Sequence, residues 1–226
     1  MRTAYLLFAT LVAAGREATA LERPDPIALY GDQIAFDVER NGTPIGRHIV
    51  HFEQTEAGLK SRSDVEMAVD VLFFRAFSYR YQADAVWREG GLDRLTVDIN
   101  DNGQRSYLTA QRAGEKLWVS RDGRVFEAAA GLYPSEHWDA GVVKQQRVLN
   151  TLTGKINHVA IQPEGRDPVE TERGTIAATR YRYTGDLDAE VWYDDAGRWV
   201  KLRFKGRDGS TIAYRCRSCQ GGAPRT

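Results

Sequence analysis

Hydrophobic and polar residues alternate with a period of two along most of the chain, as in β-strands with one buried and one wet side. The clearest stretch is 77–88, where one face carries Phe77, Tyr79, Tyr81, Ala83, Ala85 and Trp87. In the preceding stretch, Val65, Met67, Val69 and Val71 also share a face. Further predicted strands are 33–40, 45–53, 92–100, 105–111, 117–120, 124–128, 159–162, 169–172, 176–183, 189–193, 200–204 and 212–216.

Pairs of residues that tolerate positive φ separate these stretches and predict sequential hairpins. Examples are Asn41-Gly42, Asn102-Gly103 and Asp122-Gly123. A strongly twisted sheet of more than about ten strands curls or splits. The sequence therefore predicts an all-β, mainly antiparallel fold, in which a curled meander sheet forms a barrel or half-barrel of roughly 10 to 13 strands.

One segment, 133–154, lacks the strict alternation. Trp138, Val142, Leu149 and Leu152 recur near helical spacing, and Gly154 could cap a helix at its C-terminus. We therefore expect one short helical segment in an otherwise β-rich chain.

The N-terminus has the order of a cleavable secretory signal: Arg2, an apolar run over 4–14, and small residues at Ala18 and Ala20. The run is shorter than the roughly 20 apolar residues that span a bilayer. We expect a signal peptide over 1–20, with an uncleaved anchor as the alternative. The mature chain, 21–226, would be a single β-rich domain with a frayed C-terminal tail, periplasmic or secreted and not membrane-spanning after cleavage.

Charge and cysteine content narrow the function classes. The whole chain has 31 basic and 31 acidic side chains, and loss of Arg2, Arg16 and Glu17 with the leader leaves a formal charge of −1. A chain with this balance of charges has no strong positive electrostatic field that would attract nucleic acid. Cys216 and Cys219 are predicted to form a disulfide in an oxidising compartment. A redox role or half of a zinc site remains the alternative.

Residues of catalytic or metal-binding type occur without a convincing pattern. His48 and His51 would point to opposite faces of one strand and are expected at polar surface positions. Ser135, His137 and Asp139 resemble a catalytic set, but a triad gathers its members from separate elements, and a loop with a helix-capping serine explains the same residues. We expect no catalytic residue, no metal site and no cofactor, and therefore no enzyme.

The order of segments resembles a family of exported proteobacterial proteins classed only as a domain of unknown function. The segments are YGDQIAFDVERNGTPIGRHIVHF, FSYRYQADAVWREGGLDRLTVD, LNTLTG and VWYDDAGRWVKLRFKGRDGSTIAY. The resemblance implies export and fold class and supplies no catalytic residues. The late hairpin VWYDDAGRWVKLRF is also similar to strand pairs of LolA-type periplasmic lipoprotein carriers, which are incomplete β-barrels closed by several helices around an apolar cavity.

The aromatic side chains allow two interpretations, an ordinary packed core or the wall of a cavity. On the second interpretation, a lipid or another hydrophobic small molecule would be bound by Phe74, Phe77, Tyr79, Tyr81 and Trp138. The alternative function is a structural or interaction module that binds an envelope protein. It is motivated by Trp192 and Trp199, which fall on the otherwise polar face of a late hairpin and could form an exposed patch.

Overall fold

The computed structural model of the protein describes residues 24–71, 74–88 and 91–221. The predicted signal peptide, 1–20, and the end of the predicted tail lie outside the described residues. These described residues contain two short helices, α1 (Pro26–Tyr30) and the 3₁₀-helix η1 (Ala140–Lys144). The strands are β1 (Gln33–Arg40), β2 (Thr43–Thr55), β3 (Gly58–Val71), β4 (Phe74–Arg88), β5 (Gly91–Asp101), β6 (Gln104–Ala113), β7 (Lys116–Arg121), β8 (Arg124–Ala129), β9 (Tyr133–Pro134), β10 (Arg147–Leu149), β11 (Ile156–Thr171), β12 (Gly174–Gly185), β13 (Ala189–Tyr193), β14 (Trp199–Lys205) and β15 (Thr211–Ser218).

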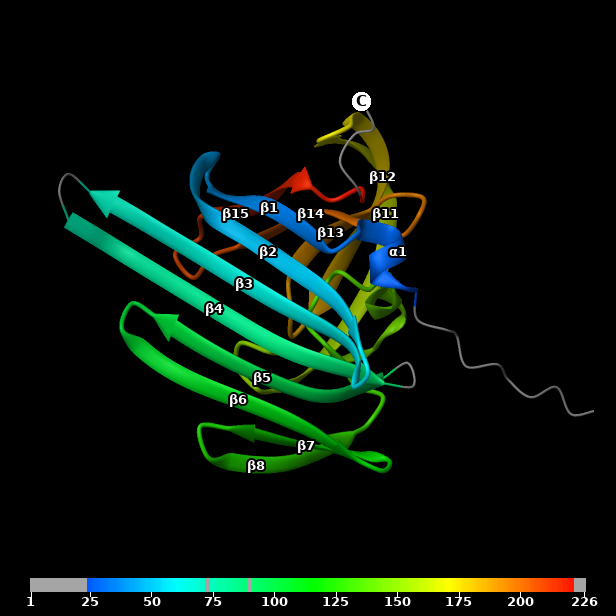
Figure 1. Ribbon diagram of the computed structural model, residues 1–226. Coiled ribbons are helices and arrows are strands. Elements are labelled where there is room, and N and C mark those ends of the chain that lie inside the picture. The colour runs from blue at the N-terminus through cyan, green and yellow to red at the C-terminus, as the bar shows by residue number, and fades with distance from the viewer. Residues whose placement is uncertain (1–23, 72–73, 89–90, 222–226) are drawn as a thin grey trace, which may run out of the picture.

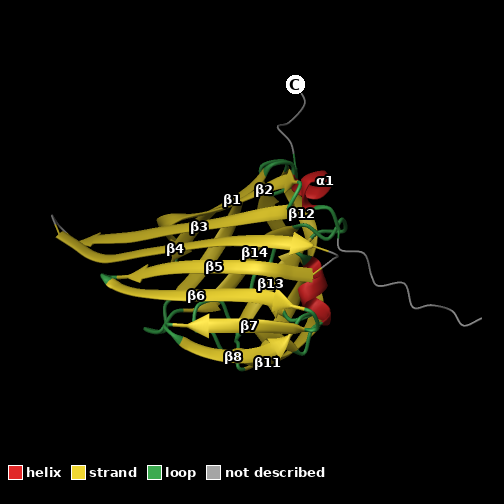
Figure 2. Ribbon diagram, turned by 60° about the horizontal axis from the view of Figure 1, so that its bottom comes forward, coloured by secondary structure: helices red, strands yellow, loops and turns green. Residues whose placement is uncertain are grey.

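These strands form one 15-stranded sheet in which chain neighbours pair, apart from the contact between β1 and β15 that joins the two halves of the chain. The ladders are antiparallel except the short pairing of β9 with β10. The sheet curls round on itself, so that β3–β8 face β11–β14 across the interior (Figures 1 and 2). Within the described residues, β8 and β9 end the strand order without pairing to each other. The predicted all-β antiparallel meander that curls into a barrel or half-barrel is confirmed, but the sheet has 15 strands rather than 10 to 13, partly because the segment predicted to be helical contributes β9 and β10.

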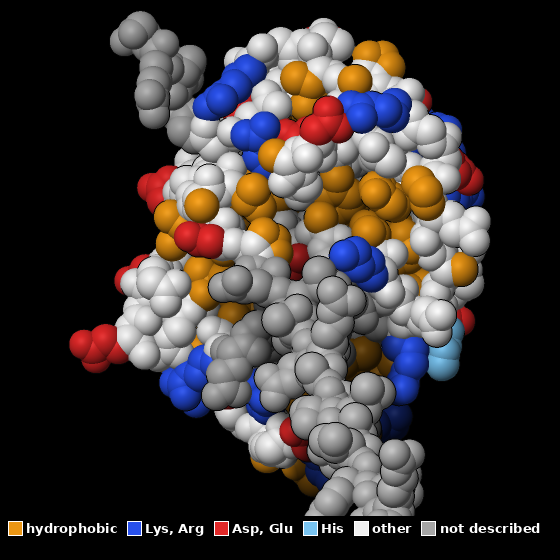
Figure 3. All heavy atoms as spheres, turned by 90° about the vertical axis from the view of Figure 1, so that its right-hand side faces the viewer, with side chains coloured by type: hydrophobic (Ala, Val, Ile, Leu, Met, Phe, Trp, Pro, Cys, Tyr) orange, Lys and Arg blue, Asp and Glu red, His pale blue; other side chains and the backbone are white. Residues whose placement is uncertain are grey.

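Both helices lie at the same end of the half-barrel (Figure 2). Figure 3 looks onto this end, where hydrophobic side chains gather between charged ones. Asp25 caps α1, its carboxylate accepting a hydrogen bond from the Ile27 amide, and Pro26 begins the helix. No described helix is long and apolar enough to cross a lipid bilayer.

The predicted helical segment contains η1 but is mostly not helical. Its ends are the short strands β9 and β10, which are held together because the Ser135 amide donates to the Leu149 carbonyl. Trp138, Val142 and Leu149 are buried by contacts with the sheet, so their spacing reflects tertiary packing rather than one face of a helix. The predicted strands 159–162 and 169–172 belong to a single strand, β11. Its pairing register with β12 is irregular between Pro163 and Arg166.

Candidate functional site

The two halves of the sheet enclose a cavity of about 1150 Å³. Small-molecule sites in proteins usually measure roughly 300 to 1000 Å³, so this space exceeds most of them. Val65 and Met67 of β3 line it from one half, and Leu202 and Phe204 of β14 line it from the other. Side chains from both halves of the sheet therefore line the interior of the half-barrel without filling it completely.

Trp138 closes the end of the cavity that carries the helices. Its side chain is 1% exposed, and its ring lies 5.3 Å from the rings of both Phe52 and Trp87. Its backbone carbonyl accepts a hydrogen bond of 2.7 Å from the Tyr30 hydroxyl, which in turn accepts one of 2.8 Å from the Trp199 amide. Tyr30 thus ties α1, the segment before η1 and β14 into one cap.

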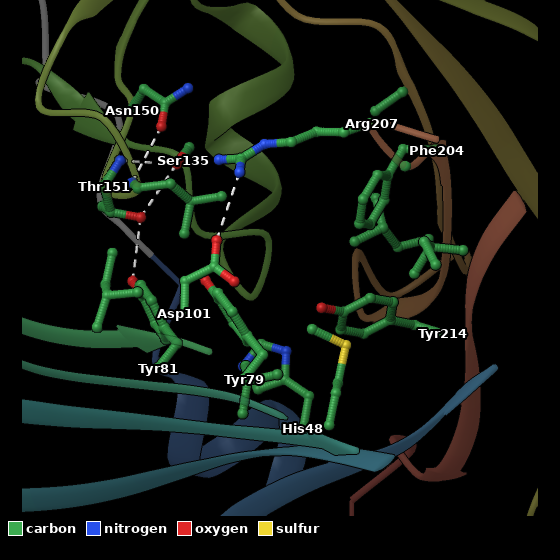
Figure 4. Close-up of a pocket in the computed structure, with 18 of the residues that line it drawn as sticks. His48, Tyr79, Tyr81, Asp101, Ser135, Asn150, Thr151, Phe204, Arg207 and Tyr214 are labelled. Carbon is green, nitrogen blue, oxygen red and sulfur yellow. Dashed lines mark hydrogen bonds and ion pairs between the residues drawn. The ribbon is translucent and has the colours of Figure 1, made fainter. Parts of the chain in front are cut away.

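A chain of hydroxyl groups crosses the cavity wall (Figure 4). The Tyr81 hydroxyl donates to Thr151 Oγ1 over 3.0 Å, and Thr151 Oγ1 lies 3.2 Å from Ser135 Oγ. The Thr151 amide donates back to Ser135 Oγ over 3.1 Å. Burial raises the pKa of the Tyr81 phenol well above its ordinary value, so this chain stays uncharged.

Two imidazoles flank Trp199 inside the half-barrel, since the ring centres of His48 and His137 each lie 5.5 Å from its ring. Neither nitrogen of His48 has a hydrogen-bond partner among the described residues, nor has Nδ1 of His137. Burial, with a smaller contribution from His137, lowers the pKa of His48 to about 3. Burial alone lowers the pKa of His137 to about 4. Both rings are therefore neutral at pH 7.

The open end of the cavity carries ionic groups (Figure 4). Arg207, in the turn between β14 and β15, approaches Asp101 at the end of β5, with 3.4 Å between Nη1 and Oδ2. Tyr79 pairs with Asp101 in the ladder of β4 and β5. Burial and then the charge of Asp101 raise the pKa of Tyr79 to about 12, while Arg207 and Arg121 oppose that rise.

The structure brings most of the predicted ligand-binding residues to this cavity. Phe77, Tyr79, Tyr81 and Trp138 all line it. The side chain of Phe74 lies outside the described residues. Trp199 and Arg207 also line the cavity and were not predicted to do so.

His48 was predicted at a polar surface position, and this prediction is wrong. His48 lines the cavity, whereas His51 is exposed as predicted. On β2, His48 has the same parity as the buried residues Val50 and Phe52. That parity is the sequence signal that could have placed its ring inside the half-barrel.

Trp192 and Trp199 do not form the predicted exposed patch, because each is 1% exposed. The register of β13 and β14 shifts between Trp192 and Tyr193, which turns Trp199 toward the interior. Trp192 faces outward but is covered by Lys201, whose Nζ lies 4.6 Å from its ring centre, and it donates to Asp167 over 2.9 Å. The interaction-module alternative thereby loses the residues that motivated it.

Ser135, His137 and Asp139 are not arranged as a triad. The Ser135 hydroxyl contacts Thr151, and the Asp139 carboxylate accepts a 2.8 Å hydrogen bond from the Gly141 amide. Asp139, and not the serine, therefore caps the helical turn of η1.

Cys216 and Cys219 form a disulfide at the end of β15. The adjacent Glu172 carboxylate accepts hydrogen bonds from the amides of Cys219, at 3.0 Å, and Gln220, at 2.8 Å. Glu172 directly follows the last residue of β11. Its hydrogen bonds therefore connect the turn that contains the disulfide to the β11–β12 hairpin.

Comparison with known proteins agrees with this architecture. A search of curated proteins found no match. A solved structure, the "beta-barrel-like protein of domain of unknown function DUF1849" from Brucella abortus, superposes with a TM-score of 0.58. Its sequence identity is 8%, and the match covers 84% of this chain and 97% of that one, so the likeness is one of fold. Residues 36–217 match DUF6134, a domain of unknown function, and the chain belongs to that family.

Proposed function

We propose that the protein binds a lipid or another hydrophobic small molecule in the interior of its half-barrel, as an exported binding protein without enzymatic activity. The single observation that carries this proposal is the cavity of about 1150 Å³ between the two halves of the sheet. A packed barrel of this size would bring opposing side chains into contact, as protein interiors normally do.

The composition of the wall supports a hydrophobic occupant. Val50, Val65 and Ile99 offer aliphatic surface on one half, and Trp138 closes the far end. The uncharged hydroxyl chain through Tyr81 could position a polar group without requiring an ion. Large apolar pockets with a few convergent polar groups are typical of sites for hydrophobic ligands.

The first experiment is native mass spectrometry of the protein purified from the periplasm of its own cells without detergent. We expect an adduct of stoichiometric amount, and extraction followed by lipid analysis would identify its chemical class. A bare mass, together with no binding of an apolar fluorescent dye, would contradict the proposal.

A cavity-filling substitution tests the location of the ligand. Met67 lines the cavity from β3, so Met67→Trp adds an indole to the space that the ligand would occupy. We expect dye binding to weaken at least about tenfold, the equivalent of about 1.4 kcal/mol. Thr96→Trp on the exposed side of β5 is the matched control and should leave binding unchanged. Equal binding by both variants would place the ligand elsewhere.

A further inference from the structure

We infer that the ligand carries an anionic head group, a carboxylate or a phosphate, which Arg207 and Arg121 bind at the open end of the cavity while the apolar tail lies inside. This inference rests on the proposed function and specifies the chemistry of its ligand. The carrying observation is that Arg207, Arg121 and Tyr79 all line the cavity, that Arg207 reaches Asp101 beside Tyr79 over 3.4 Å (Figure 4), and that Arg121 has a buried Nη1 without an acceptor among the described residues.

Arg207 is the accessible member of this group. Its side chain is 94% exposed, and its ion pair with Asp101 is long, at 3.4 Å, with Asp101 itself 32% exposed. Ion pairs between exposed groups contribute only about 0 to 1 kcal/mol. An incoming anion can therefore take the place of Asp101 beside Arg207 at little energetic loss.

Arg121, at the end of β7, supplies a second cation that is already fixed in place. Its Nη2 donates to Ser106 over 2.7 Å, and its Nε lies 3.1 Å from Asp122. Its Nη1 is buried, has no hydrogen-bond partner among the described residues, and belongs to a side chain that is 20% exposed. A buried guanidinium donor without an acceptor is unfavourable, so an anionic oxygen at this position would satisfy it.

The cavity lining carries five basic and five acidic side chains, but the carboxylates other than Asp101 already have partners. Glu136 accepts a hydrogen bond from the Trp138 indole, and Asp186 accepts one from the His158 amide. Asp208 is held by Arg40 and by Ser210, and Asp188 pairs with Arg182 on the outside. Arg105 and Lys205 also line the cavity, yet their hydrogen-bond partners among the described residues are the hydroxyls of Tyr107 and Thr211. No carboxylate among the described residues pairs with either of these two cations.

Tyr79 defines how the head group would be oriented. Its pKa of about 12 keeps the phenol protonated, so it can donate a hydrogen bond to an anion that lies between the two arginines. The opposite end of the cavity is closed by Trp138, and the neutral imidazoles of His48 and His137 also line the space, which favours an uncharged tail. The ligand would therefore enter tail first.

The test compares three ligands of one chain length with the purified, delipidated full-length mature protein: a fatty acid, a monoalkyl phosphate and a fatty alcohol. We expect the acid or the phosphate to bind about tenfold more tightly than the alcohol, and the comparison of the two anions identifies the head group. Equal affinity of all three, or a preference for the alcohol, would overturn the inference and leave the proposed function intact. If none of the three binds and the dye is also excluded, the proposed function itself fails.

Variants with opposite expected effects locate the head group. Arg207→Gln should weaken binding of the preferred anion about fivefold to tenfold and change alcohol binding less than twofold. Asp101→Asn should tighten binding of the same anion, because it removes the competing carboxylate. Arg94→Gln is the matched control, since Arg94 lies on the outer wall of β5 and contacts Gln111. If Arg207→Gln and Arg94→Gln behave alike while both keep the wild-type unfolding midpoint, Arg207 does not bind the head group.

Discussion

His48 and His137 show what the interior of the half-barrel does to a single side chain. Both imidazoles have folded-state pKa values of about 3 and about 4, below the ordinary value of 6.5, chiefly because they are buried. Between those values and 6.5 the unfolded chain binds more protons than the folded protein does. The free energy of unfolding must therefore fall as the pH drops through this window, and it is unaffected by these groups above it.

We predict that the protein loses stability between pH 7 and pH 4, by several kcal/mol, since each pKa unit corresponds to about 1.4 kcal/mol. Urea unfolding of the wild type at both pH values measures the loss. His48→Phe should retain a larger share of its pH 7 stability at pH 4, because it cannot be protonated. His51→Phe, on the exposed side of β2, should follow the wild type. An identical pH dependence in all three proteins would contradict the assignment.

For single residues, the sequence predicts which side chains lie on the same face of a strand. It does not predict which side chains lie opposite them across the cavity. Parity along β4 placed Phe77, Tyr79 and Tyr81 together, and all three line the cavity. Arg207 lies 106 residues from Asp101, and only the curling of the whole sheet brings them together. Such a pair has no local signal in the chain.

Turn residues fix where the hairpins form, and here the sequence was informative. Asn41, Asn102 and Asp122 all adopt positive φ, at 49°, 53° and 48°, in the predicted turns. Register irregularities were not predictable in this way. The shift between Trp192 and Tyr193 leaves no signature in composition, yet it moves Trp199 from the predicted outer face to the cavity.

Gly46 in β2 is required for a close approach between neighbouring strands. A Cβ atom at this position would lie 1.9 Å from the carbonyl oxygen of Glu66 in β3. We predict that Gly46→Ala destabilises the protein by about 1–3 kcal/mol, because backbone in β2 or β3 must move. Gly131→Ala, where nothing lies within 4 Å, should change stability by less than about 0.5 kcal/mol. Urea denaturation of both variants tests this difference, and equal midpoints would refute it.

The whole molecule combines an end closed by packed aromatic rings with a large internal cavity. Tyr30, Phe52, Trp87 and Trp138 pack together at the end that carries the helices. The cavity extends to residues of the β5–β6 and β14–β15 turns, where the side chain of Arg207 is 94% exposed (Figure 4). The sequence predicted a curled sheet but left open whether its interior is packed. Summed side-chain volume does not reveal the spacing between the two halves, which is set by curvature and register.

A cavity of this size makes the stability of the fold depend on what occupies it. Apolar surface that lines an empty cavity lacks the contacts that a packed core would supply, and a ligand that binds only the folded state restores them. At a free concentration of 100 times its dissociation constant, such a ligand stabilises the fold by about 2.7 kcal/mol. For a chain of this size that corresponds to an increase in Tm of roughly 5–10 °C.

We therefore predict that delipidated protein unfolds at a lower temperature than protein purified with its ligand, and that adding the ligand back restores the Tm. Met67→Trp should separate the two contributions, because an indole in the cavity supplies contacts of its own while it displaces the ligand. Its Tm should be insensitive to delipidation, whereas Thr96→Trp should lose stability on delipidation as the wild type does. Scanning calorimetry of the three proteins with and without ligand measures these differences. A wild-type Tm that does not respond to delipidation would mean that the interior needs no occupant.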